Sequence, residues 1–157
     1  MGVVNVTSLA VLLAEGNAAA GQYLNPRYAG TVRVLCTGID FAQGATAGDA
    51  TSAQRLVKLP AGTLKIVGIY LANSAFGASR TLDVGYEAYK ALSDGSTVAA
   101  STQEFWATLD VATAGGRFVW FNTPLDNRSG VTIASAVAGG TIPANATLKG
   151  YVLHVGE

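Results

Sequence analysis

Charged residues are scarce in this chain. They make up 13% of its 157 residues, and ten basic side chains balance ten acidic ones. A soluble domain usually has about 25% charged residues. The chain lacks the basic excess of a typical nucleic-acid-binding protein, so we expect no nucleic acid among its partners. Because half of its residues are hydrophobic, it is also too apolar and too neutral to be intrinsically disordered.

The side chains that most often carry chemistry are scarce as well. The chain has one cysteine, Cys36, and one histidine, His154. This excludes an internal disulfide framework and any metal site built from several cysteines, and one histidine alone cannot hold zinc. The apolar neighbours of Cys36 favour a small buried side chain over a nucleophile. The sequence contains neither a phosphate-binding loop nor a nucleophile elbow, so we expect no enzyme, no cofactor and no metal.

Carboxylates offer two weak alternatives to this interpretation. Asp83 and Glu87 would share one face of a strand but lie about 13 Å apart, beyond the range of about 5–9.5 Å that a glycosidase pair needs. A solvated or ion-paired strand face is favoured instead. Asp40 and Asp49 flank a glycine-rich loop, but the spacing of a calcium-binding loop is absent.

The first 30 residues differ from the rest of the chain. Ser8 can cap a short helix over Leu9–Glu15, and Pro26 bars a helix across the stretch that follows. The apolar run is too short to cross a membrane, and no basic residue precedes it, so we expect neither a signal peptide nor a membrane partner. Residues 1–30 are therefore expected to form a short helix and an extended docking arm. The alternative is that they pack on their own domain.

From residue 31 onward the apolar residues recur at the period of a β-strand. Leu82, Val84 and Tyr86 alternate with polar or small residues, and glycine-rich or proline-containing turns separate about eight short strands. We predict an all-β domain over residues 31–157, an antiparallel β-sandwich or jelly roll.

Three finer expectations follow from this pattern. The strands at 52–59 and 63–72 flank a Pro-Ala-Gly turn and should pair as a hairpin. The strand at 63–72 is apolar on both faces, which is typical of a strand that is either central or covered by a partner on its second face. Ser101 and Glu104 match a capping box, which predicts a short helix after residue 101.

Candidate interface residues come from the arm and from one apolar strand. Trp120 lies in a Phe-Val-Trp-Phe run that is too apolar for two solvated faces, so it should belong to the core or to an interface. The low charge and zero net charge also favour association with other subunits. The expected interface residues are Leu9, Leu12, Leu13, Tyr23, Arg27, Tyr28 and Trp120.

Several stretches resemble small structural proteins of tailed bacteriophages. These are the turn Leu59–Gly62, the loop and strand over Leu71–Glu87, the segment Phe105–Gly115 and the final strand Ala146–Val152. The resemblance covers roughly residues 50–155 and rests on structural motifs. Among the roles of these proteins, the closest is head decoration, also called cement.

The resemblance implies a β-sandwich that binds the outside of the capsid and reinforces it. It implies two partners, the major capsid protein and further copies of the chain, which often form a homotrimer. It places the protein on the virion surface after synthesis in the host bacterial cytoplasm, and it supplies no catalytic residues. Alternatives are a head-fibre or tail component and, from another class, a carbohydrate-binding β-sandwich module, with an enzyme third.

Overall fold

The computed structural model describes residues 34–49 and 53–156, and every regular element within these ranges is a β-strand. The strands are β1 (Val34–Ala42), β2 (Ala53–Leu59), β3 (Gly62–Asn73), β4 (Thr81–Tyr86), β5 (Tyr89–Lys90), β6 (Thr97–Val98), β7 (Ser101–Asp110), β8 (Gly115–Asn127), β9 (Val131–Ala138) and β10 (Thr147–Gly156). The described ranges include no helix that is long and apolar enough to cross a membrane.

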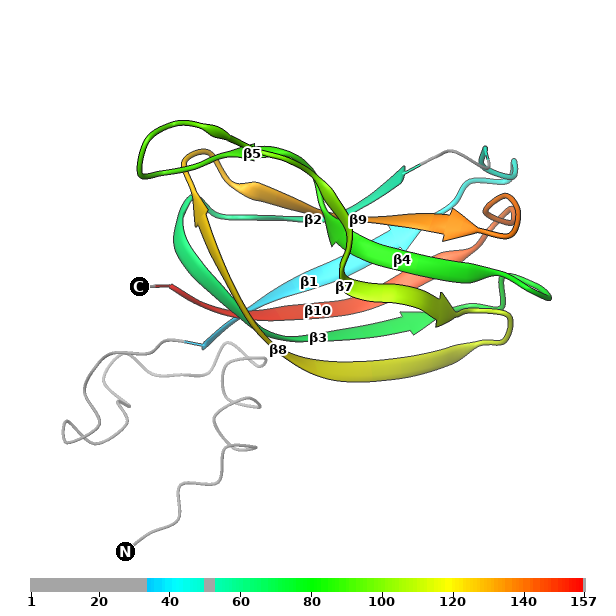
Figure 1. Cartoon of the computed structure of the whole chain (residues 1–157). Coiled ribbons are helices and arrows are strands. Elements are labelled where there is room, and N and C mark those ends of the chain that lie inside the picture. The colour runs from blue at the N-terminus through cyan, green and yellow to red at the C-terminus, as the bar shows by residue number, and fades with distance from the viewer. Residues whose placement is uncertain (1–33, 50–52, 157) are drawn as a thin grey trace, which may run out of the picture.

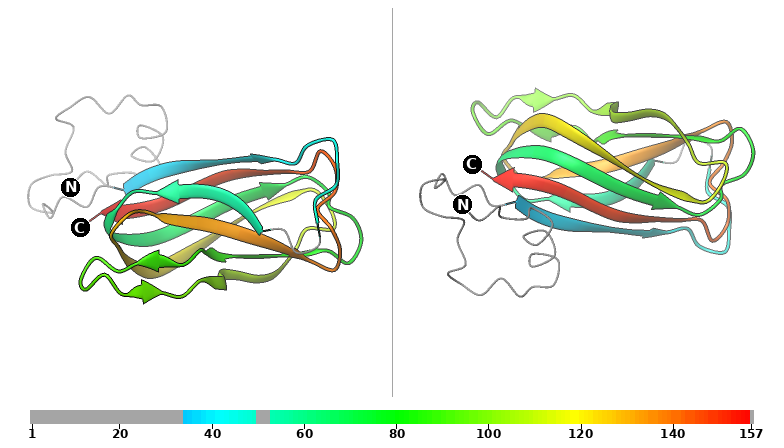
Figure 2. Two further views of the ribbon diagram at one scale, coloured as in Figure 1. Left: turned by 90° about the horizontal axis from the view of Figure 1, so that it is seen from above. Right: turned by 90° about the horizontal axis from the view of Figure 1, so that it is seen from below.

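The eight long strands pair as if the chain were folded in half. β1 pairs with β10, β2 with β9, β3 with β8 and β4 with β7, all antiparallel. Further pairing of β10 with β3 and of β9 with β4 joins them into sheet A, in the order β1-β10-β3-β8, and sheet B, in the order β2-β9-β4-β7. The two sheets lie face to face (Figure 1 and Figure 2). This arrangement is a jelly roll, which confirms the predicted fold class.

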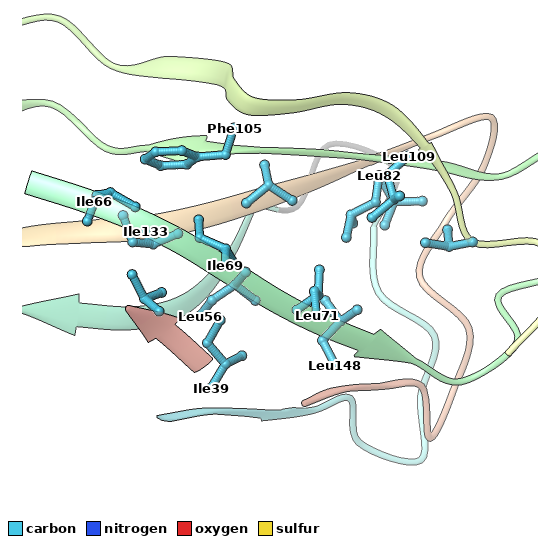
Figure 3. Close-up of a cluster of buried hydrophobic side chains, with 14 of the residues drawn as sticks. Ile39, Leu56, Ile66, Ile69, Leu71, Leu82, Phe105, Leu109, Ile133 and Leu148 are labelled. Carbon is cyan, nitrogen blue, oxygen red and sulfur yellow. The ribbon is translucent and has the colours of Figure 1, made fainter. Parts of the chain in front are cut away.

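The core fills the space between the two sheets. Ile66, Ile69 and Leu71 of β3 point towards side chains of sheet B such as Leu82 and Ile133 (Figure 3). All five are at most 2% exposed. Each buried aliphatic side chain of this kind contributes about 1.5–3 kcal/mol through removal of apolar surface from water.

A β-bulge explains why β3 looked apolar on both faces. Adjacent residues Leu153 and His154 of β10 pair with Gly68 and Ile66, so Val67 is an extra residue in β3 relative to β10. Leu64, Ile66, Ile69 and Leu71 all point into the core as a result, although strict alternation would divide them between two faces. β3 lies between β10 and β8, so the prediction of a central strand is confirmed.

Two local predictions are wrong. Residues 52–59 and 63–72 do not form a hairpin, because β2 and β3 belong to different sheets and the turn between them crosses from one sheet to the other. The segment after Ser101 is not a helix but strand β7. The Ser101 hydroxyl does lie 3.4 Å from a Glu104 carboxylate oxygen, yet pairing with β4 overrides this local helix signal.

Candidate functional site

The outer face of sheet A carries an array of aromatic side chains. Strand register aligns its residues in rows across all four strands. One row is Cys36, Leu153, Gly68 and Trp120, and the next is Gly38, Tyr151, Tyr70 and Phe118, in the order β1-β10-β3-β8. We call these eight residues the aromatic face.

Two side chains of the aromatic face are large, apolar and exposed. Trp120 is 70% exposed and Phe118 is 36% exposed. The expectation that Trp120 belongs to the core is therefore wrong, and its assignment to an interface remains a prediction. Exposed apolar surface of this size, gathered in one place, is typical of an interaction surface.

The aromatic rings form a continuous cluster. Tyr70 stacks on Tyr151 with a centroid distance of 5.4 Å, and Phe118 contacts Trp120 edge to face at 4.7 Å. Phe118 also lies 6.4 Å from Tyr151, which links the two pairs. The cluster thus extends over β10, β3 and β8.

Glycines on neighbouring strands make room for these rings. A methyl group at Gly68 would lie 2.6 Å from Phe118 Cζ, so the Phe118 ring occupies the space of the missing side chain. A methyl group at Gly116 would lie 2.5 Å from the Tyr70 hydroxyl in the same way. An aromatic ring laid over a strand glycine covers its backbone and fixes the strand pairing. This local order gives the cluster a fixed shape.

The aromatic face has few charges around it. Asp40 and Lys149 lie in the adjoining row and form an ion pair of 3.5 Å with each other. Lys65 lies on the other side of the face, across from Pro124. This surface therefore offers no set of charges that would recognise a strongly charged partner.

The outer face of sheet B is different. Arg55 and Glu87 form an ion pair of 2.6 Å there. Asp83 accepts hydrogen bonds from the Gln103 amide at 2.9 Å and from the Thr108 backbone N–H at 2.7 Å. Asp83 and Glu87 thus have separate partners, in accord with the ion-paired strand face that the sequence favours. Sheet B presents a polar surface, so the two outer faces are not equivalent.

Cys36 and His154 lie on opposite sides of sheet A. Cys36 is exposed on the outer face, so the expectation that it is buried is wrong. Partial burial still raises the pKa of its thiol, which makes the thiolate scarcer at neutral pH. His154 is 1% exposed and points into the interior. The sheet separates the two side chains, so they do not form a catalytic dyad.

Acidic side chains do not gather into a metal site in the described ranges. Groups of three or more His, Cys, Asp or Glu that could hold an ion are absent there. Asp40, one of the two residues weighed for calcium, lies in β1 and pairs with Lys149.

His154 has an unusual hydrogen-bonding environment. Its Nε2 lies 2.9 Å from the Thr37 hydroxyl, and its buried Nδ1 has no hydrogen-bond partner among the described residues. Burial lowers the pKa of His154 below its ordinary value, because the charged imidazolium is poorly solvated there.

A pH dependence of stability follows. An unfolded chain protonates His154 near pH 6.5, whereas the folded chain holds this side chain neutral to lower pH. The free energy of unfolding should therefore fall as the pH drops below about 6.5. Urea unfolding from pH 8 to pH 5 measures this step, and His154→Leu should diminish it. An unchanged pH profile in His154→Leu would mean that another group is responsible.

The arm residues proposed as interface lie outside the described residues. These are Leu9, Leu12, Leu13, Tyr23, Arg27 and Tyr28. Sequence reasoning missed Tyr70, Tyr151 and Phe118 as members of an exposed surface. The signal available for two of them was a glycine two residues before an aromatic residue, as in Gly68-Ile-Tyr70 and Gly116-Arg-Phe118.

Comparison with known proteins bears on the fold. No family model matches the chain, and no curated protein matches it. Among solved structures, it is similar to a chain in the capsid of Ralstonia phage GP4, with 18% identity, a TM-score of 0.61 and coverage of 87% of this chain and 93% of that chain. A chain in the capsid asymmetric unit of cyanophage Pam1 is 16% identical with a TM-score of 0.58, over 90% of this chain and 97% of that chain.

A third similarity extends to a virus of another kind. A chain of the T13 IBDV viral particle is 15% identical with a TM-score of 0.52. The match covers 90% of this chain but 36% of that one, so most of this chain corresponds to one part of a larger protein. In the two phage structures, by contrast, the match extends over nearly the full length of both chains. The chain has the jelly-roll fold of these capsid components.

Proposed function

We propose that this chain is a structural protein of a bacteriophage capsid and, more specifically, a head decoration protein that binds the outside of the shell. The observation that carries the proposal is the near full-length similarity to chains from two phage capsids. The bare aromatic face supports it, because a surface of this composition is suited to burial against another subunit. We propose that its partners are the major capsid protein and further copies of this chain, with which it forms a homotrimer.

The role needs no catalytic group. A decoration protein acts by bridging its neighbours, which adds buried area to the shell. The polar side chains of Arg55 and Glu87 on sheet B form an ion pair with each other, and groups of three or more His, Cys, Asp or Glu that could hold a metal ion are absent from the described ranges. We therefore assign the protein no enzymatic activity.

Cosedimentation with empty capsids of the phage that encodes the chain tests this proposal. The chain should pellet with the shells and reach a fixed copy number. Trp120→Ala should weaken attachment by about 2 kcal/mol, or about 30-fold in apparent Kd, because an exposed aromatic anchor is lost. Arg55→Ala on the outer face of sheet B is the matched control and should bind as wild type. Absence of the wild-type chain from the pellet would contradict a decoration role.

A carbohydrate-binding module is the second candidate. The exposure of Trp120 favours it, since such modules use exposed aromatic rings. The ring geometry argues against it, because Phe118 and Trp120 meet at 80° and do not form a flat platform. A glycan array distinguishes the two functions: specific glycan binding that Trp120→Ala abolishes, without cosedimentation, would establish the module.

A further inference from the structure

The aromatic face lacks a partner in the described residues, although its shape is well defined. The rings of Phe118 and Tyr70 lie over Gly68 and Gly116, and Trp120 remains 70% exposed. A rigid apolar surface loses little conformational freedom on binding, which favours a complementary apolar segment as its occupant. Asp40 and Lys149 on one side of the face neutralise each other and Lys65 adds a single charge on the other, so a segment with little charge fits best.

The chain itself contains such a segment. Residues 1–33 precede the first described strand and carry three charged side chains, Glu15, Arg27 and Arg33. They join the sandwich at β1, which is an edge strand of the same sheet. Fully extended, 33 residues span up to about 110 Å, whereas four strands make a face about 15–20 Å wide. The segment is thus long enough to reach and cross the aromatic face of an adjacent molecule.

The direction in which the segment joins the sheet favours an adjacent molecule over its own sandwich. β1 begins at Val34, which lies opposite Val155 near the end of sheet A, so the segment joins the sheet at the end of an edge strand. To cover its own aromatic face, the chain would have to reverse its direction at that end. The zero net charge also removes the repulsion that would keep copies apart.

We propose that the aromatic face of one subunit binds the N-terminal segment, residues 1–33, of a neighbouring copy of the chain. This inference rests on the proposed function and names the contact that would hold the homo-oligomer together. Each subunit gives a segment to one neighbour and receives a segment from another. A closed ring of such head-to-tail contacts leaves no aromatic face uncovered.

A mixing experiment with two complementary variants tests the contact. The first variant lacks residues 2–29 and keeps the aromatic face. The second keeps its segment but carries Trp120→Glu, with Cys36→Ala so that only the first variant has a thiol. Neither variant should associate with itself. Their mixture should form a heterocomplex by analytical ultracentrifugation, in which Cys36 of the first variant reacts with a maleimide about tenfold more slowly than when this variant is alone.

Each other outcome overturns the proposal. A mixture that stays monomeric, with Cys36 equally reactive, shows that the segment does not cover the face. If the full chain is monomeric and protects Cys36 at every dilution, the segment folds back on its own sandwich. In a separate measurement on the full chain, protection of Cys36 that appears only when capsids are added shows that the shell covers the face. The mixing experiment contains no capsids, so its failure is distinguishable from a failure of the decoration role, which cosedimentation measures separately.

Discussion

A chain that lacks residues 2–29 should keep its two sheets and lose most of its attachment to capsids. The first described strand begins at Val34, and both sheets have all eight long strands without the deleted residues. Ordering a free arm costs about 1–2 kcal/mol per residue in backbone entropy, so the contacts of a docked arm with its partner must offset this free-energy cost. Circular dichroism should report an unchanged β-sheet spectrum. Cosedimentation should report an apparent Kd raised about 100-fold or more, because multivalent attachment is lost together with subunit association.

A chain in which residues 2–29 are replaced by a Gly-Ser linker of equal length is the matched control. It keeps the length of the arm but removes its apolar side chains, so it should behave as the deletion does. Attachment that the linker restores would show that only length matters. If the deleted chain unfolds, the arm belongs to the core of its own domain, and if it decorates capsids at full occupancy, the arm has no clamping role.

The sequence predicts the fold class because strand alternation is a local property. In β4, Leu82 and Val84 are fully buried while Asp83 between them points to the other face, as the period of two requires. β3 departs from this rule at Val67, where a single extra residue relative to β10 reverses the side-chain alternation. A bulge depends on the partner strand, so the sequence of β3 alone does not reveal it.

Strand pairing is less predictable because the jelly roll is built from distant contacts. β1 pairs with β10, and β2 pairs with β9 rather than with the adjacent strand β3. The Pro60-Ala61 turn looks like a hairpin turn, but a turn of this kind can equally connect two sheets. The capping-box signal at Ser101 fails for the same reason, because pairing with β4 outweighs a local preference.

The aromatic face, like the strand pairing, could be predicted from the sequence only in part. The apolar run around Trp120 indicates that one side of β8 needs a partner, and Trp120 itself was identified in this way. Which ring points outward depends on the register that places Trp120 opposite Gly68 and Phe118 opposite Tyr70. That register joins residues about 50 positions apart in the chain, and no local pattern encodes it.

Gly85→Ala should destabilise the sandwich by about 3 kcal/mol, at the upper end of the usual cost of overpacking. β4 advances from Val84 to Tyr86 while β7 runs from Trp106 to Ser101, so β7 has extra residues opposite Gly85. A methyl group at Gly85 would overlap the Ser101 carbonyl oxygen, which is backbone and cannot swing aside. β7 would have to move away from β4 at this point.

The cost of that movement extends into the core. Phe105 lies on the bulged part of β7 and is 5% exposed. Its ring centroid lies 5.3 Å from that of Phe121 and 6.4 Å from that of Tyr86. A displaced β7 therefore loosens the packing on the side of the sandwich where the edge strands β7 and β8 meet. Urea unfolding should show the lower free energy of unfolding, and the midpoint of thermal unfolding should fall by about 6–12 °C.

Gly38→Ala is the matched control, because Gly38 is also a strand glycine and has open space around it. It should change stability by no more than about 0.5 kcal/mol. Equal stability of the two variants would mean that β7 does not fold tightly over Gly85.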